Sequence, residues 1–386
     1  MSGATPPVLH RLRDLIDADR DGFAQKVFAR FFGNSPELRD LFPAHMSHVR
    51  EAFVDVLDHV LDVLPGDSGH EELIELLAQL GRDHRKYGVT DAHYNQMAQA
   101  LVTESARLLG TEWNTESAET VAQGMLLTTG VMRGAAQTVE GPATWRARVV
   151  QKFTINRERA VIRLVAVDPM PPFHSGQYLE TQIPQWPHVW RNLSPAIPPN
   201  DAGELEFHVR AVPGGAFSAA VVAETAPGDV WTFAQSHGRL RIDGDRPVLM
   251  VAGGTGLAPL RALLLEMARR ADTPPTHLFY GARFPGELYD LAMLRELATT
   301  NPWLTLTGVV EETTDPWWIT GAVDPGQWGV SIARGKVGDV AARYADWSDR
   351  QVLIAGPPDM VISTKLRLRL AGVPSERMQH DPVAQH

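Results

Sequence analysis

Apolar residues in roughly the first 140 positions recur at spacings of three and four, the period that places side chains on one face of an α-helix. Turn signals separate these segments: Asn-Ser-Pro at 34–36, a Pro/Gly-rich stretch at 64–69 and a Gly-containing stretch at 87–91. The pattern predicts a helical segment. The positions that carry it are Phe23, Val27, Phe28, Phe31 and Phe32, and later Leu73, Leu76, Leu77 and Leu80.

The pattern changes near Glu140-Gly141-Pro142. From Trp145 to about Ile242 it consists of short β-rich runs separated by Pro and Gly turns, which is typical of an antiparallel barrel or sandwich. From Arg246 onward apolar strands alternate with helices, which indicates a doubly wound parallel sheet. The sequence therefore predicts a multidomain chain, with an all-α domain over 1–141, an antiparallel β-barrel over 142–243 and a doubly wound α/β domain over 244–386.

Composition narrows the classes of partner. The 386-residue chain carries 36 basic and 46 acidic residues, a net charge of −10, and has no basic run, so nucleic acid and anionic membrane surfaces are not expected partners. No apolar stretch reaches about 20 residues and the first residues do not form a secretory signal, so we expect no membrane span and a cytoplasmic location. Small molecules are the expected partners, and the oligomeric state stays open.

The chain contains no cysteine. This excludes disulfides, cysteine-ligated iron–sulfur clusters, thiolate-ligated haem and covalent haem attachment. Any redox chemistry must use organic cofactors, or a metal held by histidine, methionine or carboxylates.

A glycine-rich turn joins an apolar strand to a helix that begins near Pro259. The turn consists of Gly253, Gly254, Thr255 and Gly256. Glycines let the backbone approach a pyrophosphate, and a helix N-terminus presents N–H groups and a positive dipole end to it. Taken alone, the turn is equally typical of a tight strand-to-helix connection without a ligand.

The stretch Gly-Gly-Thr-Gly-Leu-Ala-Pro resembles the NAD(P)-binding motif of the ferredoxin–NADP reductase superfamily. Tyr-Gly-Ala-Arg at 280–283 and Ala-Gly-Pro-Pro-Asp-Met at 355–360 agree with that superfamily in order and spacing, with Ala355 where a cysteine is usual. The resemblance implies an NAD(P)H site that includes Arg283, Gly356 and Pro357 beside the glycine turn. It does not separate NADH from NADPH.

The preceding barrel would then bind FAD. Arg191-Asn192-Leu193-Ser194 resembles the superfamily's Arg-x-Tyr-Ser motif, which implies that Arg191 pairs with a flavin phosphate and that Ser194 bonds near the reactive flavin nitrogen. Gly214, Gly215 and Ser218 resemble the loop that wraps the pyrophosphate. The alternatives are a solvated arginine and an ordinary glycine turn.

Two positions depart from the flavin motif. Leu193 stands where the tyrosine that stacks on the flavin ring is usual, and the aromatic residue that covers the other face would fall near Val383. These departures put flavin affinity, flavin potential and nicotinamide access in question.

A helical domain ahead of such a reductase resembles the flavohaemoglobins. Residues 34–43 resemble the family's stretch before the distal region and place Phe42 against the haem, whereas residues 79–94 resemble the proximal segment. The resemblance implies a non-covalent b-type haem with His84 as axial ligand and Tyr94 beside it. His84 follows Leu73, Leu76, Leu77 and Leu80 at helical spacing and is expected on their inward face; the alternative is a histidine at an exposed helix end.

The haem pocket departs from the family in three places. The distal tyrosine becomes Phe28, and the distal glutamine position falls on Val49, with His45 and His48 nearby. The proximal glutamate position falls within residues 132–137, which contain no carboxylate. Such contacts usually control ligand basicity and oxygen activation, so the fold is expected to be retained while these groups are lost.

The resemblance implies that hydride passes from NAD(P)H to FAD and single electrons to haem iron, and that nitric oxide is oxidised to nitrate by O2. Two other functions fit the same residues. One is a divergent oxidoreductase that uses another acceptor, or another donor such as a 2-hydroxy acid, and the other is a haem-based gas sensor or binding protein.

Overall fold

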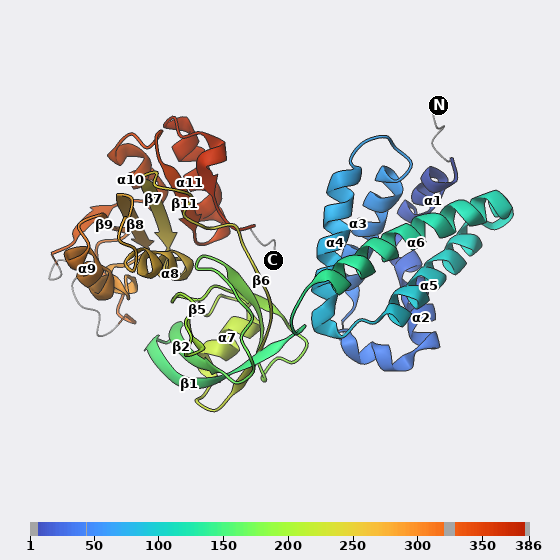
Figure 1. The fold of residues 1–386 in the computed structure, drawn as a ribbon, viewed down its shortest axis with the longest axis horizontal. Coiled ribbons are helices and arrows are strands. Elements are labelled where there is room, and N and C mark those ends of the chain that lie inside the picture. The colour runs from blue at the N-terminus through green and yellow to red at the C-terminus, as the bar shows by residue number, and fades with distance from the viewer. Residues whose placement is uncertain (1–6, 44, 320–328, 383–386) are drawn as a thin grey trace. The chain divides into compact units, whose positions relative to one another are not determined.

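The structure is a computed structural model that describes residues 7–43, 45–319 and 329–382. It divides into two compact units, Met1–Thr144 and Trp145–His386 (Figure 1). The predicted order of an all-α domain, an antiparallel β-barrel and a doubly wound α/β domain is confirmed. None of the helices within the described ranges is long and apolar enough to cross a membrane. Val383 lies outside the described residues.

The first unit is built from helices. Its elements are α1 (Pro7–Asp17), α2 (Arg20–Asn34), the 3₁₀ turn η1 (Pro36–Leu41), α3 (Ser47–Val63), α4 (His70–His84), η2 (Arg85–Tyr87), α5 (Asp91–Leu109), η3 (Gly110–Glu112) and α6 (Thr115–Thr138). Helix α2 begins after Asp19, whose carboxylate accepts a hydrogen bond from the Gly22 amide. The apolar face of α2 enters the core as its spacing predicts, with Phe23, Val27, Phe28 and Phe31 buried.

Helix α4 buries a narrower stripe than its leucine pattern predicts. Leu73 and Leu77 are buried, whereas Leu76 is 38% exposed. The stripe continues at Gly81, where α6 lies so close that a Cβ atom would come within 2.0 Å of the Met132 carbonyl oxygen. The expectation that Leu76 lies on the inward face was wrong, because steps of four residues from Leu73 lead through Leu77 to Gly81.

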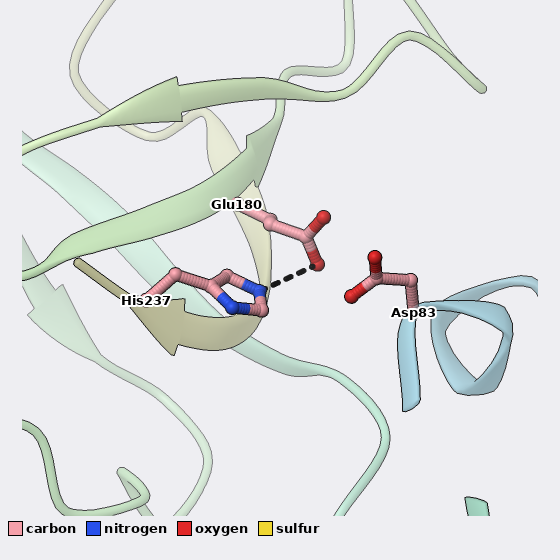
Figure 2. Close-up of side chains that lie close together, drawn as sticks. All are labelled: Asp83, Glu180 and His237. Atoms are coloured by element: carbon pink, nitrogen blue, oxygen red, sulfur yellow. Dashed lines mark ion pairs between the residues drawn. The ribbon is translucent and has the colours of Figure 1, made fainter. Parts of the chain in front are cut away.

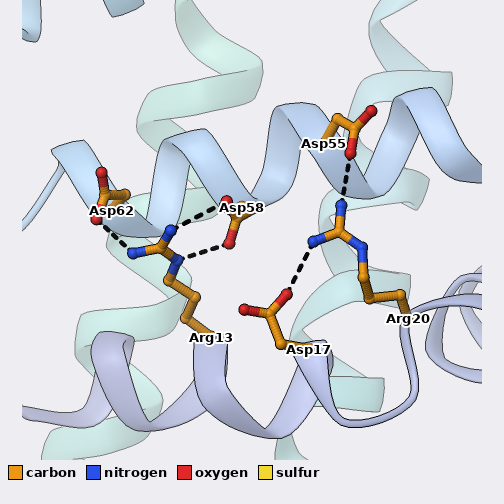
Figure 3. A network of polar contacts seen from close by, with 6 residues as sticks. All are labelled: Arg13, Asp17, Arg20, Asp55, Asp58 and Asp62. Carbon is orange, nitrogen blue, oxygen red and sulfur yellow. Dashed lines mark hydrogen bonds and ion pairs between the residues drawn. The ribbon is translucent and has the colours of Figure 1, made fainter.

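Ion pairs join the N-terminal helices to α3 (Figure 3). Arg13 Nε lies 2.6 Å from Asp58 Oδ1, and the same guanidinium contacts Asp62. Arg20 Nη2 lies 2.5 Å from Asp55 Oδ1. The hydrogen bond from Arg13 holds the pKa of Asp58 below its ordinary value. These partly exposed contacts link α1 and the start of α2 to α3 on the solvent side of the apolar core.

The second unit begins with an antiparallel barrel. Its elements are β1 (Trp145–Asn156), β2 (Arg159–Ala166), β3 (Tyr178–Gln182), β4 (Arg191–Leu193), β5 (Glu204–Arg210), α7 (Ala216–Ala223) and β6 (Val230–His237). The strand order is β4-β3-β6-β1-β2-β5. A bridge between Pro195 and Phe207 joins the two ends of this sheet, so the end of β4 lies against β5. Trp145, Phe207, Trp231 and Phe233 fill the interior.

The rest of the second unit is a parallel sheet covered by helices on both faces. Its elements are β7 (Val248–Gly253), η4 (Gly254–Gly256), α8 (Leu257–Met267), β8 (Thr276–Ala282), η5 (Pro285–Glu287), α9 (Leu291–Thr300), β9 (Leu304–Val310), β10 (Ser331–Arg334), α10 (Val337–Tyr344), β11 (Gln351–Ala355), α11 (Pro358–Leu370), η7 (Ser375–Arg377) and β12 (Met378–Gln379). The strand order is β10-β9-β8-β7-β11-β12. Helices α8 and α9 pack on one face, and α10 and α11 on the other. The order reverses between β7 and β11, the place where doubly wound sheets bind ligands.

A buried charge in the helical unit generates a stability prediction. Arg30 Nε lies 2.6 Å from Glu104 Oε1, and Glu104 is buried, with Arg107 as its second partner at 3.3 Å. We expect Arg30→Met to lower the free energy of opening of α2 and α5 by about 3 kcal/mol, because a buried carboxylate loses its main partner. Native-state hydrogen exchange of the full chain measures this free energy.

The matched control is Arg11→Met. Arg11 pairs with Glu112 at 3.1 Å, but both side chains are about half exposed, so the cost should stay below about 1 kcal/mol. Equal losses in the two variants would contradict the role given to burial.

Candidate functional site

The strand ends at the switch point meet through glycines. Ala252 of β7 pairs with Ala355 of β11. A Cβ atom on Gly256 would lie 2.4 Å from the Ala355 carbonyl oxygen, and one on Gly356 would lie 3.2 Å from the Gly253 Cα. These close contacts leave no room for side chains, so the glycines let the two strand ends approach each other.

Gly254 differs from its neighbours. Its φ is +55°, and a Cβ atom there would meet nothing within 4 Å. It is followed by half-buried Thr255 and by the first turn of α8. An open, glycine-lined surface at a helix N-terminus and at the switch point fits a dinucleotide pyrophosphate. Pro357 follows Gly356 directly after β11, and its side chain is exposed.

Arg283 lies just beyond the end of β8, the strand next to β7. Its side chain is exposed, with the guanidinium 5.0 Å from the centre of the Phe284 ring. Its backbone amide donates to Glu287 Oε2 at 3.1 Å. Among the described residues no carboxylate pairs with the Arg283 guanidinium, so it could meet an anionic ligand.

The predicted flavin segment spans β4 and the residue after it. Arg191 is exposed and donates to the Trp190 carbonyl oxygen at 2.8 Å, and Asn192 is also exposed. Leu193 packs against the barrel core, and Ser194 is half-buried. Exposed Arg191 is placed to meet a phosphate, whereas the Leu193 side chain contributes to the barrel interior.

The predicted pyrophosphate loop leads into α7. Gly214 has a φ of +76°, and a Cβ atom on Gly215 would lie 2.8 Å from the Ser218 Oγ. Ser218 Oγ accepts from the Val212 amide and donates to the Gly215 carbonyl, both at 3.1 Å. Ser218 therefore holds the loop in shape. Helix α7 packs on β5, the strand that also receives the end of β4.

A pair of polar residues lies on two neighbouring strands of the barrel. Glu180 of β3 and His237 of β6 form an ion pair at 3.8 Å between Oε2 and Nε2 (Figure 2). Glu180 is buried, and the His237 ring lies tilted against that of Tyr178, with 5.7 Å between ring centres. The sequence pattern does not predict this contact, because the two residues belong to strands that are distant in the chain.

A group of charged residues joins the barrel to the α/β domain within the second unit. Glu206 Oε1 lies 3.0 Å from Arg261 Nη1 and 3.0 Å from His208 Nε2. His208 Nδ1 lies 2.9 Å from the Tyr289 hydroxyl. Burial alone would raise the pKa of Glu206, but the hydrogen bond with His208 and the charge of Arg261 lower it from 4.5 to about 2. Sequence reasoning missed this group, because alternate polar residues on a strand usually face solvent.

His84 closes α4 in the helical unit. Its Nδ1 lies 3.2 Å from the hydroxyl of Tyr94, a buried residue of α5. Burial, with a smaller contribution from Lys86, lowers the pKa of His84 to about 4. Burial raises the pKa of Tyr94 to about 12. At neutral pH the imidazole is uncharged and one ring nitrogen is held by Tyr94, which leaves Nε2 for a metal.

Residues 132–137 lie in the last turns of α6, and none of them is a carboxylate. Their Met132 carbonyl lies against Gly81, one turn before His84. The hydrogen-bond partner of His84 is therefore the phenol of Tyr94. A neutral phenol makes the imidazole less electron-rich than a carboxylate would.

The predicted distal positions form an aromatic cluster. The Phe28 ring lies 5.7 Å from that of Phe42 and 5.1 Å from that of Phe53, measured between ring centres. Val49 lies one helical turn before Phe53 in α3 and is half-buried. Sequence reasoning missed Phe53, although its spacing of four from Val49 was a signal for the same face.

The two histidines near Val49 point elsewhere. His45 is exposed, and the side chain of His48 is 97% exposed and lies 3.9 Å from Glu51. Neither supplies a hydrogen-bond donor to the Phe28 cluster in this structure.

Three known families match successive parts of the chain. They are Globin over residues 25–125, Oxidoreductase FAD-binding domain over 146–242 and Oxidoreductase NAD-binding domain over 250–365. Each match falls on the part of the fold described above, with the globin match on the helical unit and the other two on the barrel and the parallel sheet.

Curated relatives match the reductase half. The reductase component of propane 2-monooxygenase from Rhodococcus jostii is 28% identical over 240 residues, 61% of this chain and 62% of that protein. The corresponding component from Mycolicibacterium goodii is 31% identical over 240 residues, 61% of this chain and 66% of that protein. The chain thus spans less than two thirds of the length of these curated relatives.

Solved structures match both halves. A flavohaemoglobin from Malassezia yamatoensis with bound FAD and haem aligns over 98% of each chain, with a TM-score of 0.69 and 14% identity, a likeness of fold alone. The ferredoxin reductase of carbazole 1,9a-dioxygenase aligns over 63% of this chain and 70% of that chain, with a TM-score of 0.52 and 26% identity.

The charged group on β5 generates a prediction about acid stability. Because the folded-state pKa of Glu206 is about 2, below its ordinary value of 4.5, its contribution is complete above pH 4.5 and is lost as the pH falls toward 2. We expect the urea midpoint of the second unit to fall between pH 4.5 and 2, and to fall less steeply in Glu206→Gln.

Glu204→Gln is the control, because Glu204 lies on the same strand but is exposed. It should titrate like the wild type. If Glu206→Gln and Glu204→Gln show the same acid profile, Glu206 does not carry the acid sensitivity of this unit.

Proposed function

We propose that this chain, which has the flavohaemoglobin architecture of a globin domain followed by FAD- and NAD-binding oxidoreductase domains, oxidises nitric oxide to nitrate with O2. The coarser class, an electron-transfer oxidoreductase with haem, FAD and a nicotinamide nucleotide, follows from those domains. The observation that carries the haem chemistry is His84, which is neutral, half-buried and held at Nδ1 by Tyr94.

The reductase residues would bind the two organic cofactors. Gly253, Gly254, Thr255 and Gly256 would cradle the nucleotide pyrophosphate, with Gly356, Pro357 and Arg283 beside it. Arg191 would pair with a flavin phosphate, Asn192, Leu193 and Ser194 would border the flavin ring, and Gly214, Gly215 and Ser218 would contact its pyrophosphate. These cofactors supply hydride and single-electron transfer, and the protein supplies orientation and exclusion of water.

The distal pocket sets the expected rate. Phe28, Phe42, Val49 and Phe53 are apolar, so none of them donates a hydrogen bond to an oxygen ligand. We therefore expect O2 to leave faster and nitric oxide to be consumed more slowly than the flavohaemoglobin resemblance implies.

A second candidate is transfer of electrons to a different acceptor. The reductase half is 28–31% identical to proteins named as monooxygenase reductase components. Leu193, which packs into the barrel core, would leave the flavin ring without the usual stacking aromatic. Both observations favour an acceptor that reaches the flavin directly.

Stopped-flow consumption of nitric oxide by the holoprotein with NADH and O2 separates the two. Rapid, stoichiometric nitrate formation supports the dioxygenase. Fast flavin reduction by NADH, together with negligible nitric oxide consumption and turnover of an artificial acceptor, would favour the second candidate and overturn the first.

The nucleotide site generates a prediction at Gly254. Gly254→Val should raise the KM for NADH at least about tenfold, because its side chain would fill the surface where the pyrophosphate must approach. Steady-state reduction of ferricyanide measures this constant. Gly244→Val is the matched control, since Gly244 also has a positive φ, +64°, with nothing within 4 Å of its Cβ position, but lies in an exposed turn. A KM raised equally in both variants would mean that backbone strain is the cause.

The haem site generates a paired prediction. His84→Ala should lose most of the haem and its Soret band, because the only nitrogen ligand proposed is removed. Phe28→Tyr should slow O2 dissociation roughly 10- to 150-fold, the effect of a hydrogen bond worth about 1.5–3 kcal/mol. Flash photolysis and Soret spectra measure these quantities. A His84→Ala protein with full haem content would refute the ligand assignment.

A further inference from the structure

Strand β5 is buried on both of its faces. Leu205, Phe207 and Val209 point into the barrel core, as alternation along a strand requires. Glu206 and His208 point the other way and are nevertheless buried, at 4% and 7% exposure. The α/β domain covers them, so two polar side chains lie in a dry junction between the two halves of the reductase unit.

Arg261 supplies the positive charge of this junction. It lies in the second turn of α8 and is 9% exposed. Its Nη1 lies 3.0 Å from Glu206 Oε1 on the barrel, and its Nε lies 2.7 Å from Asp290 Oδ2 beside α9. One guanidinium therefore lies between the buried carboxylate of Glu206 on the barrel and the half-buried carboxylate of Asp290 in the α/β domain, an arrangement that suits arginine's planar fork.

The same side chain reaches the backbone two residues beyond the flavin segment. Arg261 Nη1 donates to the Ala196 carbonyl oxygen at 2.6 Å. Ala196 also donates its amide to the Glu206 carbonyl at 2.7 Å, and it follows Ser194 by two residues. The backbone of Arg261 belongs to α8, the helix that begins directly after Gly256. Arg261 thus donates a hydrogen bond to the chain just after the flavin segment, and it lies on the helix that follows the nucleotide turn.

We propose that Arg261 is the positioning residue that sets the approach of the nicotinamide to the flavin, by bonding Ala196 and Glu206 of the barrel to the helix that follows the nucleotide turn. This inference rests on the proposed cofactor sites. The step it serves breaks the nicotinamide C4–H bond and forms the flavin N5–H bond, moving two electrons and one proton as hydride. The nucleotide is oxidised by two electrons and the flavin is reduced by two.

Neighbouring arginines provide the contrast that makes the inference testable. Arg163 contacts the other oxygen of Glu206 at 2.7 Å, but it belongs to β2 and is half exposed, so it holds nothing of the α/β domain. Arg159 also crosses the junction, to Glu287 at 2.9 Å, and is buried. Its partner Glu287 lies in η5 rather than in α8. Only Arg261 joins the two cofactor segments among these three.

The experiment is anaerobic stopped-flow reduction of the flavin by NADH in the full-length holoprotein. We expect Arg261→Met to lower the limiting rate constant roughly 10- to 100-fold, the effect of a misplacement of about 1 Å at the reacting atoms. The NADH concentration at half-saturation should change less than about threefold, because the pyrophosphate cradle is intact. The kinetic isotope effect with 4-deuterated NADH should rise, because hydride transfer then limits the rate.

Two controls accompany it. Arg163→Gln should keep the wild-type rate within about twofold, although it also removes a partner of Glu206. Arg159→Met should destabilise the unit while leaving the rate per bound FAD close to wild type. If Arg261→Met does not fold, Arg261→Lys takes its place, since it keeps the charge but loses the fork, and a fall of about three- to tenfold is expected.

Hydrogen exchange gives a readout that does not depend on activity. In Arg261→Met the amides near Ala196 and in the first turns of α8 should both exchange faster, and in Arg163→Gln they should not. A wild-type rate per FAD in folded Arg261→Met would overturn the positioning role alone. A wild-type protein that neither NADH nor NADPH reduces would overturn the proposed electron path and this inference together.

Discussion

Close approach of two backbones is the constraint from which both candidate sites are built. In the helical unit, Gly81 lets α6 come against α4 one turn before His84. In the reductase unit, Gly256 lies against the Ala355 carbonyl, which brings the ends of β7 and β11 together. A side chain at either glycine would separate the elements, because protein interiors are close-packed and the atoms it meets belong to the backbone. Both candidate sites therefore depend on glycines that let backbone segments approach each other.

Buried charge sets the second level of organisation. The ion pairs of Arg13 with Asp58 lie near solvent, where such contacts contribute little. Glu206 and Arg261 are dry, so each requires its partner and the geometry between them is narrowly defined. A junction of this kind orients the barrel against the parallel sheet more strictly than an apolar contact of the same area, because displacement would leave a charge unpaired. The reductase unit thus has a defined geometry where its two cofactor segments meet.

The helical unit places the proposed ligand His84 beside a phenol. His84 is neutral and oriented, but its partner is the phenol of Tyr94, a weaker acceptor than a carboxylate. The predicted distal cluster, which includes Phe28 and Phe53, presents only aromatic carbon. These side chains offer no hydrogen-bond donor to a polar ligand.

Local pattern in the sequence determined the kinds of element, their order and the glycine turn after Val248–Gly253, because helical and strand periods and tight turns depend on residues only a few positions apart. Resemblance to known motifs added which turns would meet which cofactor. Only the tertiary structure decided that Phe53 contacts Phe28 and that Arg261 of α8 contacts both Glu206 and the Ala196 carbonyl of the barrel. Whether a polar residue on a strand is buried depends on which distant element covers it. The local spacing of hydrophobic residues carries no information about that element.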